Sequence, residues 1–383
     1  MEKEPHQMRY EKPLLEEEEN NIKEYLFPFD LKEIGDLKEV IKNFPETIID
    51  FHSHSGSEGI VEESKIPESY GDIFLYREIG ATLMHRAILS GMITRQDFHK
   101  VYQVVMAFPF RGTNIKKANE WLLKETEGGG GFLPFFILPP GNDMLEQTKK
   151  NLEAGHYFGI GEMHPEFVSP RAENIRGKRG YLSEEILEVI NKQELPIIIH
   201  LPSHLLNHVE EIKKLSIDYP KLKIVLAHMG LVQVLTPRSK EALKEVVNLP
   251  NVYFDTSTVT DKEVFAYVLK ESGAEKILFA SDAPFDALKL EVRFIEGKMK
   301  IFSSQDLPGA EKVHEEIKRM LISSPEALIE AIKEVYPDEN QAKLAKENIF
   351  YQNALKILPR KLPPFREEWM YMDEDWILTK YEM

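Results

Sequence analysis

Eight short apolar runs recur along the middle of this chain, and longer stretches with helical spacing separate them. The runs lie at 47–51, 101–108, 133–138, 157–161, 196–199, 223–227, 252–255 and 276–280. The clearest helical patterns lie at 183–193, 205–215, 240–247 and 261–271. Such alternation is typical of parallel βα units, and eight units over about 235 residues fit a (β/α)8 barrel, which usually spans about 250 residues. We therefore predict an α/β fold of the TIM-barrel class.

Four of these runs lead directly into a histidine or a glutamate, and the run at 276–280 leads through Ser281 into an aspartate. The first run ends in a His-x-His pair, and residues i and i+2 of a strand point to the same face. Barrel enzymes place their chemistry at the carboxyl ends of the strands, where the five ends meet. An open, doubly wound sheet would not bring them to one point so easily. The candidate ligands of a divalent ion are His52, His54, Glu162, His200, His228 and Asp282.

Each of these residues also has a structural explanation when it is considered alone. Asp282 could cap a helix, Glu162 could pair with an arginine, and His200 or His228 could be a hydrogen-bonded core histidine. If none of them bound metal, a separate structural explanation would have to hold at each of five strand ends. The sequence therefore favours a metal centre.

Composition excludes several classes of function. The 383-residue chain is 42% hydrophobic, which is enough to bury a substantial core, and it carries a formal net charge of −16. This charge disfavours general binding to nucleic acid or to an anionic membrane. There are no cysteines, so thiolate zinc sites, disulfides and cysteine nucleophiles are excluded. The first twenty residues lack an apolar signal region, and no stretch reaches the roughly eighteen apolar residues of a spanning helix, so we expect a cytoplasmic protein.

The chain divides into three predicted regions. Residues 1–45 form an acidic N-terminal extension, 46–290 form the barrel, and 291–383 form a helical C-terminal region that completes it. A cap over the barrel mouth is expected at about 55–100, between the first two strands. Helices are expected in the C-terminal region at 310–321, 325–335 and 340–357. The aromatic tail beyond them is compatible with packing on a second subunit, and hence with a homo-oligomer.

Five motifs resemble those of a known family, the amidohydrolase superfamily, in its amidohydrolase 2 branch. The motifs are Asp-Phe-His-Ser-His at 50–54, Ile-His-Leu-Pro at 199–202, Leu-Ala-His-Met-Gly at 226–230, Phe-Ala-Ser-Asp-Ala-Pro at 279–284 and Gln-Asn-Ala-Leu-Lys-Ile at 352–357. The resemblance covers about residues 46–358. It implies a metal-dependent TIM-barrel hydrolase.

The resemblance also implies roles for individual residues. His52, His54, His200 and Asp282 would bind a divalent ion, usually zinc, whereas His228 would bind a second ion or act as a proton donor. Glu162 occupies a position that holds a carboxylated lysine in many binuclear relatives and a bridging glutamate in TatD-like deoxyribonucleases. Decarboxylase-type relatives often have no ligand there. A glutamate at this position favours contact with metal, and one or two ions are possible.

The predicted mechanism follows from charge. A zinc ion lowers the pKa of its bound water to about 7 and so supplies hydroxide near neutral pH, while Asp282 is the expected base. The predicted function is a metal-dependent hydrolase that uses this hydroxide on an amide, lactone or ester bond of a small molecule. The alternatives are a decarboxylase or hydratase of the same family, a TatD-like nuclease, which net charge and the large cap disfavour, and a metal-binding protein without turnover. Substrate contacts are expected from Arg111, His164 and His204.

Overall fold

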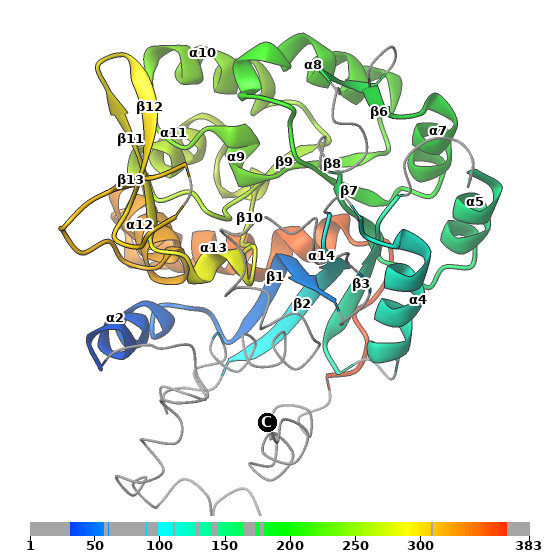
Figure 1. Cartoon of the computed structure of the whole chain (residues 1–383), viewed down its shortest axis with the longest axis horizontal. Helices are drawn as coiled ribbons and strands as arrows, with labels where there is room; N and C mark the ends of the chain where they lie inside the picture. The colour runs from blue at the N-terminus through cyan, green and yellow to red at the C-terminus, as the bar shows by residue number, and fades with distance from the viewer. Residues whose placement is uncertain are drawn as a thin grey trace, which may run out of the picture.

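An eight-stranded parallel barrel forms the centre of the molecule. The computed structural model describes residues 31–56, 60, 89, 99–109, 112–127, 130–138, 145–163, 173–176, 180–307 and 309–365. The barrel strands, in their order around the sheet, are β1 (Thr47–Ser55), β2 (Lys100–Ala107), β3 (Phe132–Phe136), β4 (Gly159–Met163), β7 (Pro196–Ile199), β8 (Lys223–Leu226), β9 (Val252–Asp255) and β10 (Ile277–Leu278). Figure 1 shows these strands inside a ring of helices.

The barrel closes between β1 and the segment that follows β10. The amide of Phe51 donates to the carbonyl of Phe279 at 2.9 Å, and the amide of Asp282 donates to the carbonyl of His52 at 2.8 Å. Ser53 and Ala283 form a parallel bridge between the same two segments. The structure thus confirms the predicted (β/α)8 class, and all eight predicted strands are present with ends shifted by a few residues.

Helices on the outside of the barrel connect its strands. They are α4 (Ile115–Glu125), α5 (Leu145–Glu153), α7 (Glu184–Lys192), α8 (Val209–Asp218), α10 (Pro237–Val246) and α11 (Lys262–Ser272). Capping residues begin several of them: Ser183 accepts from the amide of Ile186, and Thr236 forms a capping box with Ser239 ahead of α10. The four helical patterns predicted between the later strands are confirmed. The second is divided into the 3-10 turn η5 (Leu205–Asn207) and α8.

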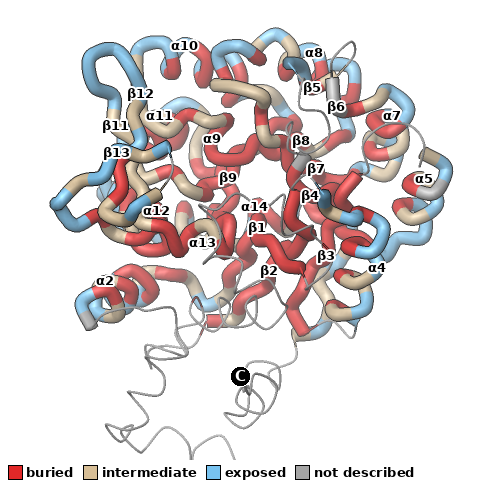
Figure 2. The backbone as a smooth tube through the Cα atoms, viewed as in Figure 1, coloured by how far each residue is buried: buried red, intermediate tan, exposed pale blue. Residues whose placement is uncertain are grey.

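The core lies inside the barrel and between its strands and helices. Figure 2 shows buried residues along the strands and exposed residues on the outer faces of the helices. β4 lies so close to its neighbour that a Cβ atom at Gly159 would come within 2.5 Å of the ring of Phe135 and 2.8 Å of the carbonyl oxygen of Pro196. Glycine is therefore required for close packing of the strand that carries Glu162.

Short strands and turns complete the loops. A two-stranded sheet of β5 (Asn174–Arg176) and β6 (Gly180–Leu182) lies between β4 and α7, and single turns occur at α9 (His228–Leu231), η6 (Ala274–Lys276) and η7 (Phe285–Ala287). The C-terminal helices are α12 (Met320–Val335), α13 (Glu339–Glu347), the π-helical turn η8 (Asn348–Gln352) and α14 (Asn353–Ile357). They confirm the patterns predicted at 325–335 and 340–357.

The helix predicted at 310–321 is wrong. A three-stranded sheet of β11 (Leu290–Ile295), β12 (Lys298–Ser303) and β13 (Glu311–Lys312) occupies the start of the C-terminal region, and β13 pairs with β12. Helix α12 begins only at Met320, after Arg319, whose backbone is extended and whose buried guanidinium donates to Glu33 and to the carbonyl of Ala287. Tertiary contacts have therefore overridden the local helical pattern.

In the N-terminal extension, the described residues begin with helix α2 (Leu31–Ile41). This helix packs on α12 and carries Glu33. Most of the predicted cap lies outside the described residues, because only 60 and 89 are described between 57 and 98. The aromatic tail, from 366 onward, also lies outside them. Among the described residues, no helix combines the length and the apolar character that are required to cross a membrane.

Candidate metal centre

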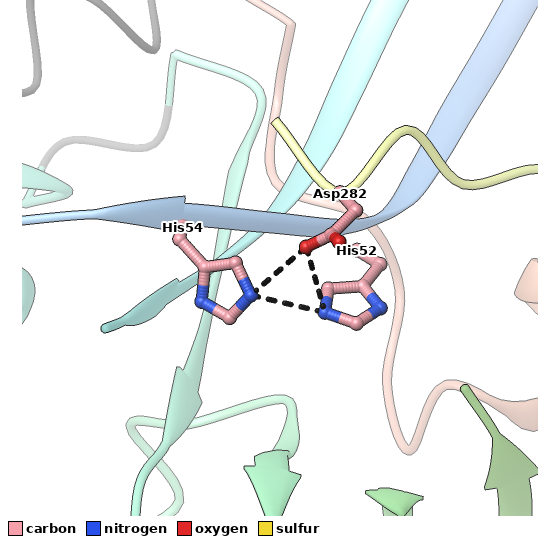
Figure 3. A group of neighbouring side chains, drawn as sticks. All are labelled: His52, His54 and Asp282. Carbon is pink, nitrogen blue, oxygen red and sulfur yellow. Dashed lines mark hydrogen bonds and ion pairs between the residues drawn. The ribbon is translucent and has the colours of Figure 1, made fainter. Parts of the chain in front are cut away.

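Three predicted ligands converge where β1 meets the segment after β10. The Nε2 atoms of His52 and His54 lie 3.1 Å apart, and Oδ1 of Asp282 lies 3.6 Å from the first and 3.2 Å from the second. Figure 3 shows both imidazoles and the carboxylate facing one another. We refer to these three residues as the β1 group.

Hydrogen bonds to the other ring nitrogens indicate why a cation suits the β1 group. Nδ1 of His52 lies 2.9 Å from a carboxylate oxygen of Asp255, and Nδ1 of His54 lies 3.3 Å from the carbonyl oxygen of Ala107. Ionised carboxylates and carbonyls only accept hydrogen bonds, so each ring donates through Nδ1. The lone pairs of two neutral rings would then face each other at 3.1 Å. A cation held between them relieves this repulsion.

A second set of three ligands lies beside the first. Glu162 comes from β4, His200 follows β7 and His228 follows β8, and one ligand atom of each lies within 4.8 Å of the others. We refer to these residues as the β4 group. Nδ1 of His200 lies 2.9 Å from the carbonyl oxygen of Leu201.

Glu162 connects the two groups. Its Oε2 lies 3.6 Å from Nε2 of His54 and 3.9 Å from Nε2 of His52, while its Oε1 lies 3.5 Å from Nε2 of His228. The side chain is buried, and Oε1 makes no hydrogen bond among the described residues. A buried carboxylate oxygen without a hydrogen-bond donor is stabilised by nearby positive charge, which a metal ion would supply. The position of Glu162 between the groups is the one that a bridging ligand would occupy.

Two of the candidate ligands have backbones in the left-handed region. The φ angles are 54° at His228 and 63° at Asp282, in a region that residues other than glycine adopt infrequently. Buried hydrogen bonds hold both positions: the amide of His228 donates to Asp255 at 2.8 Å, and the amide of Asp282 donates to the carbonyl of His52. Strained backbone of this kind is frequent at functional sites.

A second pair of hydrogen bonds supports Asp282 through its neighbour. The amide and the hydroxyl of Ser281 both donate to the carboxylate of Asp50, at 2.9 and 2.7 Å. Asp50 is fully buried and lies on β1, in the same motif as His52 and His54. The Asp-x-His-x-His motif therefore contains two candidate ligands and also anchors the segment that carries a third.

The charges of the centre change the pKa values of its members. Burial alone would lower the pKa of His52, but the carboxylates of Asp282, Asp255 and Glu162 raise it to about 10. Burial also disfavours the charged form of His228, and the same three carboxylates raise its pKa. Conversely, burial would raise the pKa of Glu162, but His228 and the neighbouring imidazoles hold it well below its usual range. The carboxylates of the centre thus favour the protonated forms of His52 and His228, and the imidazoles favour the ionised form of Glu162.

Aromatic rings border the β1 group on one side. The ring of Phe108 stacks on His54 with centroids 5.7 Å apart, and Phe285 meets the same imidazole edge-on at 5.7 Å. The two phenylalanines lie 6.2 Å from each other. They form an apolar wall that keeps water away from one side of the imidazole.

The donor set fits a divalent metal. Four imidazoles and two carboxylates are ligands for zinc and similar ions, and their atoms converge from five different strand ends. For metal–ligand bonds of about 2.0–2.2 Å, adjacent ligand atoms lie roughly 3–3.5 Å apart, which is close to the 3.1–3.6 Å within the β1 group.

Three further residues were predicted to contact substrate: Arg111, His164 and His204. The amide of Leu206 donates to Nδ1 of His204, which thus caps the turn η5, and the role of His204 in substrate binding stays a prediction. Arg111 and His164 lie outside the described residues. The sequence reasoning missed Asp255, the last residue of β9. Its signal in the sequence is its position at the end of the apolar run 252–255, which alone does not indicate a role.

Comparison with known protein families identifies the family to which this chain belongs. A family model described as Amidohydrolase matches residues 98–360, which is more than half of the chain and includes Glu162, His200, His228 and Asp282. None of the curated proteins matches the sequence. The chain therefore belongs to the amidohydrolase family, in its amidohydrolase 2 branch, and is a metal-dependent enzyme.

Solved structures of similar proteins share this fold. A putative amidohydrolase from Staphylococcus aureus is 16% identical, with 82% of this chain and 100% of that chain covered, at a TM-score of 0.50. An amidohydrolase from Burkholderia multivorans with bound HEPES is 10% identical, with coverage of 81% and 98%, at a TM-score of 0.50. 5-carboxyvanillate decarboxylase from Sphingomonas paucimobilis is 13% identical, with coverage of 83% and 100%, at a TM-score of 0.48. At these identities the likeness to the two amidohydrolases concerns the fold alone.

Proposed function

We propose that this protein is a hydrolase that holds two divalent ions, most simply zinc, and cleaves an amide, lactone or ester bond of a small molecule. The observation that carries the proposal is the position of Glu162, with one carboxylate oxygen toward the β1 group and the other toward His228. The carboxylates of Glu162 and Asp282 together carry two negative charges, which suit two dications better than one.

The division of the ligands supports two positions for metal. His52, His54 and Asp282 would hold one ion, and His200 and His228 would hold the other, with Glu162 shared between them. When bound, such ions polarise the scissile carbonyl and lower the pKa of water near neutral pH.

Asp282 is the proposed general base. Its contacts with both imidazoles use Oδ1, so Oδ2 is the atom that we expect to take a proton from the attacking water and to return it to the leaving group. Its side chain is 9% exposed, more than that of His52 or His54, which places it nearer to solvent and to an incoming substrate.

A decarboxylase or hydratase is the second candidate. The observation in its favour is that His52, His54 and Asp282 already form a three-ligand group without Glu162, which would suffice for one ion. The two candidates differ in product and in their dependence on Glu162. A hydrolase releases an acid and an amine or alcohol, whereas a decarboxylase releases carbon dioxide.

The test is a substrate panel with the native protein and an Asp282→Asn variant. We expect turnover of amides, lactones or esters, and a loss of about 100-fold or more in kcat for the variant because the general base is removed. Glu263→Ala, an exposed change on α11, serves as the control and should leave turnover unchanged. Carbon dioxide release from carboxylated substrates, with no hydrolysis of the panel, would establish the lyase instead.

A further inference from the structure

Asp255 lies at the end of β9 with a fully buried side chain, between the two ligand groups. We propose that Asp255 is a positioning residue that fixes the tautomer of His52 and the backbone of His228, so that Nε2 of both imidazoles faces the metal centre. This inference rests on the proposed metal centre and adds to it a residue that binds no metal itself.

The first contact is with the imidazole of His52. Oδ2 of Asp255 lies 2.9 Å from Nδ1 of His52, and both side chains are fully buried. The carboxylate accepts, so Nδ1 carries the hydrogen and Nε2 of the neutral ring has the free lone pair. Nε2 is the atom that lies close to His54 and Asp282. Asp255 therefore selects the tautomer that ligates through the correct nitrogen.

The second contact is with the residue that follows β8. Oδ1 of Asp255 accepts from the amide of His228 at 2.8 Å and from the hydroxyl of Ser257 at 2.6 Å. The first bond holds His228 at its left-handed φ of 54°. Since the Ser257 hydroxyl donates to Asp255, its oxygen is left to accept from Nδ1 of His228, 2.9 Å away. Nε2 of His228 is then the nitrogen that faces Glu162.

One carboxylate thus connects a ligand of the β1 group with a ligand of the β4 group. An asparagine at position 255 could not make the same bonds. If its carbonyl oxygen accepted from the amide of His228 and from Ser257, its amide nitrogen would point at Nδ1 of His52 and donate to it. His52 would then carry its hydrogen on Nε2, the atom needed for the metal.

The test is the zinc affinity of Asp255→Asn, measured by competition with a chelator. We expect affinity to fall by about 10- to 100-fold, and the visible spectrum of the cobalt-substituted protein to change because a ligand nitrogen is lost. Asp261→Asn is the matched control, since Asp261 accepts from the backbone amides of Glu263 and Leu235 and caps α11. This control should keep native affinity and spectrum.

A variant that keeps native zinc affinity and the native cobalt spectrum would overturn the role of Asp255 but not the metal centre. A native protein that binds no zinc would overturn both. If Asp255→Asn does not fold, nuclear magnetic resonance of the zinc-loaded native protein with nitrogen-15-labelled histidine decides the question. The inference requires His52 to have a protonated Nδ1 and a metal-bound Nε2, and the opposite arrangement contradicts it.

Discussion

The Nε2 atoms of His52 and His54 lie 3.1 Å apart although both rings donate through Nδ1 to other groups. Two neutral imidazoles in this arrangement direct their lone pairs at each other. The nearby carboxylates of Asp282 and Glu162 add further negative charge. The fold therefore brings lone pairs and negative charges together at this centre. Protons or metal ions that bind there would offset their repulsion.

Metal removal should lower the stability of the folded protein. An ion that binds only the folded state at a free concentration 100 times its Kd adds about 2.7 kcal/mol to the free energy of unfolding. We expect a strong chelator to lower the Tm of the native protein and zinc to restore it. A His54→Ala variant should show a much smaller difference between the two conditions. Equal shifts in the two proteins would show that the stabilising metal binds elsewhere.

The effect of metal on stability should grow with pH. The pKa of His52 is raised to about 10 in the metal-free protein, above the value of about 6.5 in an unfolded chain. The stability that comes from its proton is fully present below about pH 6.5 and is lost as the pH rises toward 10. Metal binds the neutral imidazole and does not need that proton. Thermal unfolding with and without zinc between pH 6.5 and 8.5 should show a widening Tm difference, and a constant or narrowing difference would refute this.

Gly159→Ala should destabilise the barrel. The added Cβ would meet the ring of Phe135 at 2.5 Å and the carbonyl of Pro196 at 2.8 Å, so we expect a loss of about 1–3 kcal/mol in urea unfolding. Gly35→Ala is the matched control, because this glycine lies on the exposed side of α2 with nothing within 4 Å of the added Cβ. The control should gain about 0.5–1 kcal/mol from its higher helix propensity. Similar values for the two variants would contradict the packing argument.

The sequence was sufficient to predict the barrel, because its strands depend on local pattern, and the same pattern indicated the candidate ligands. Apolar runs such as 196–199 are strands in the structure, and the residues that follow them meet because parallel strands share one carboxyl end. The same strand-end rule explains why Glu162 and Asp282, far apart in the chain, lie 3.6 and 3.2 Å from Nε2 of His54.

Contacts between distant residues could not be predicted in this way. The pattern at 310–321 is compatible with a helix, but the ion pair of Arg319 with Glu33 and the pairing of Glu311–Lys312 with β12 produce a different structure. Asp255 was missed for a related reason. A single carboxylate at a strand end has many explanations, and its role becomes visible only when His52 and His228 are seen to donate to it.

The most direct test of the account is the number of divalent metal ions per chain in the native protein and in Glu162→Ala, determined by elemental analysis after metal-replete purification. Glu263→Ala is the control for the loss of a carboxylate outside the centre. We predict two ions in the native protein and in the control, and one ion in Glu162→Ala, because the shared ligand is removed. One ion in all three proteins, or none in the native protein, would contradict a binuclear centre connected by Glu162.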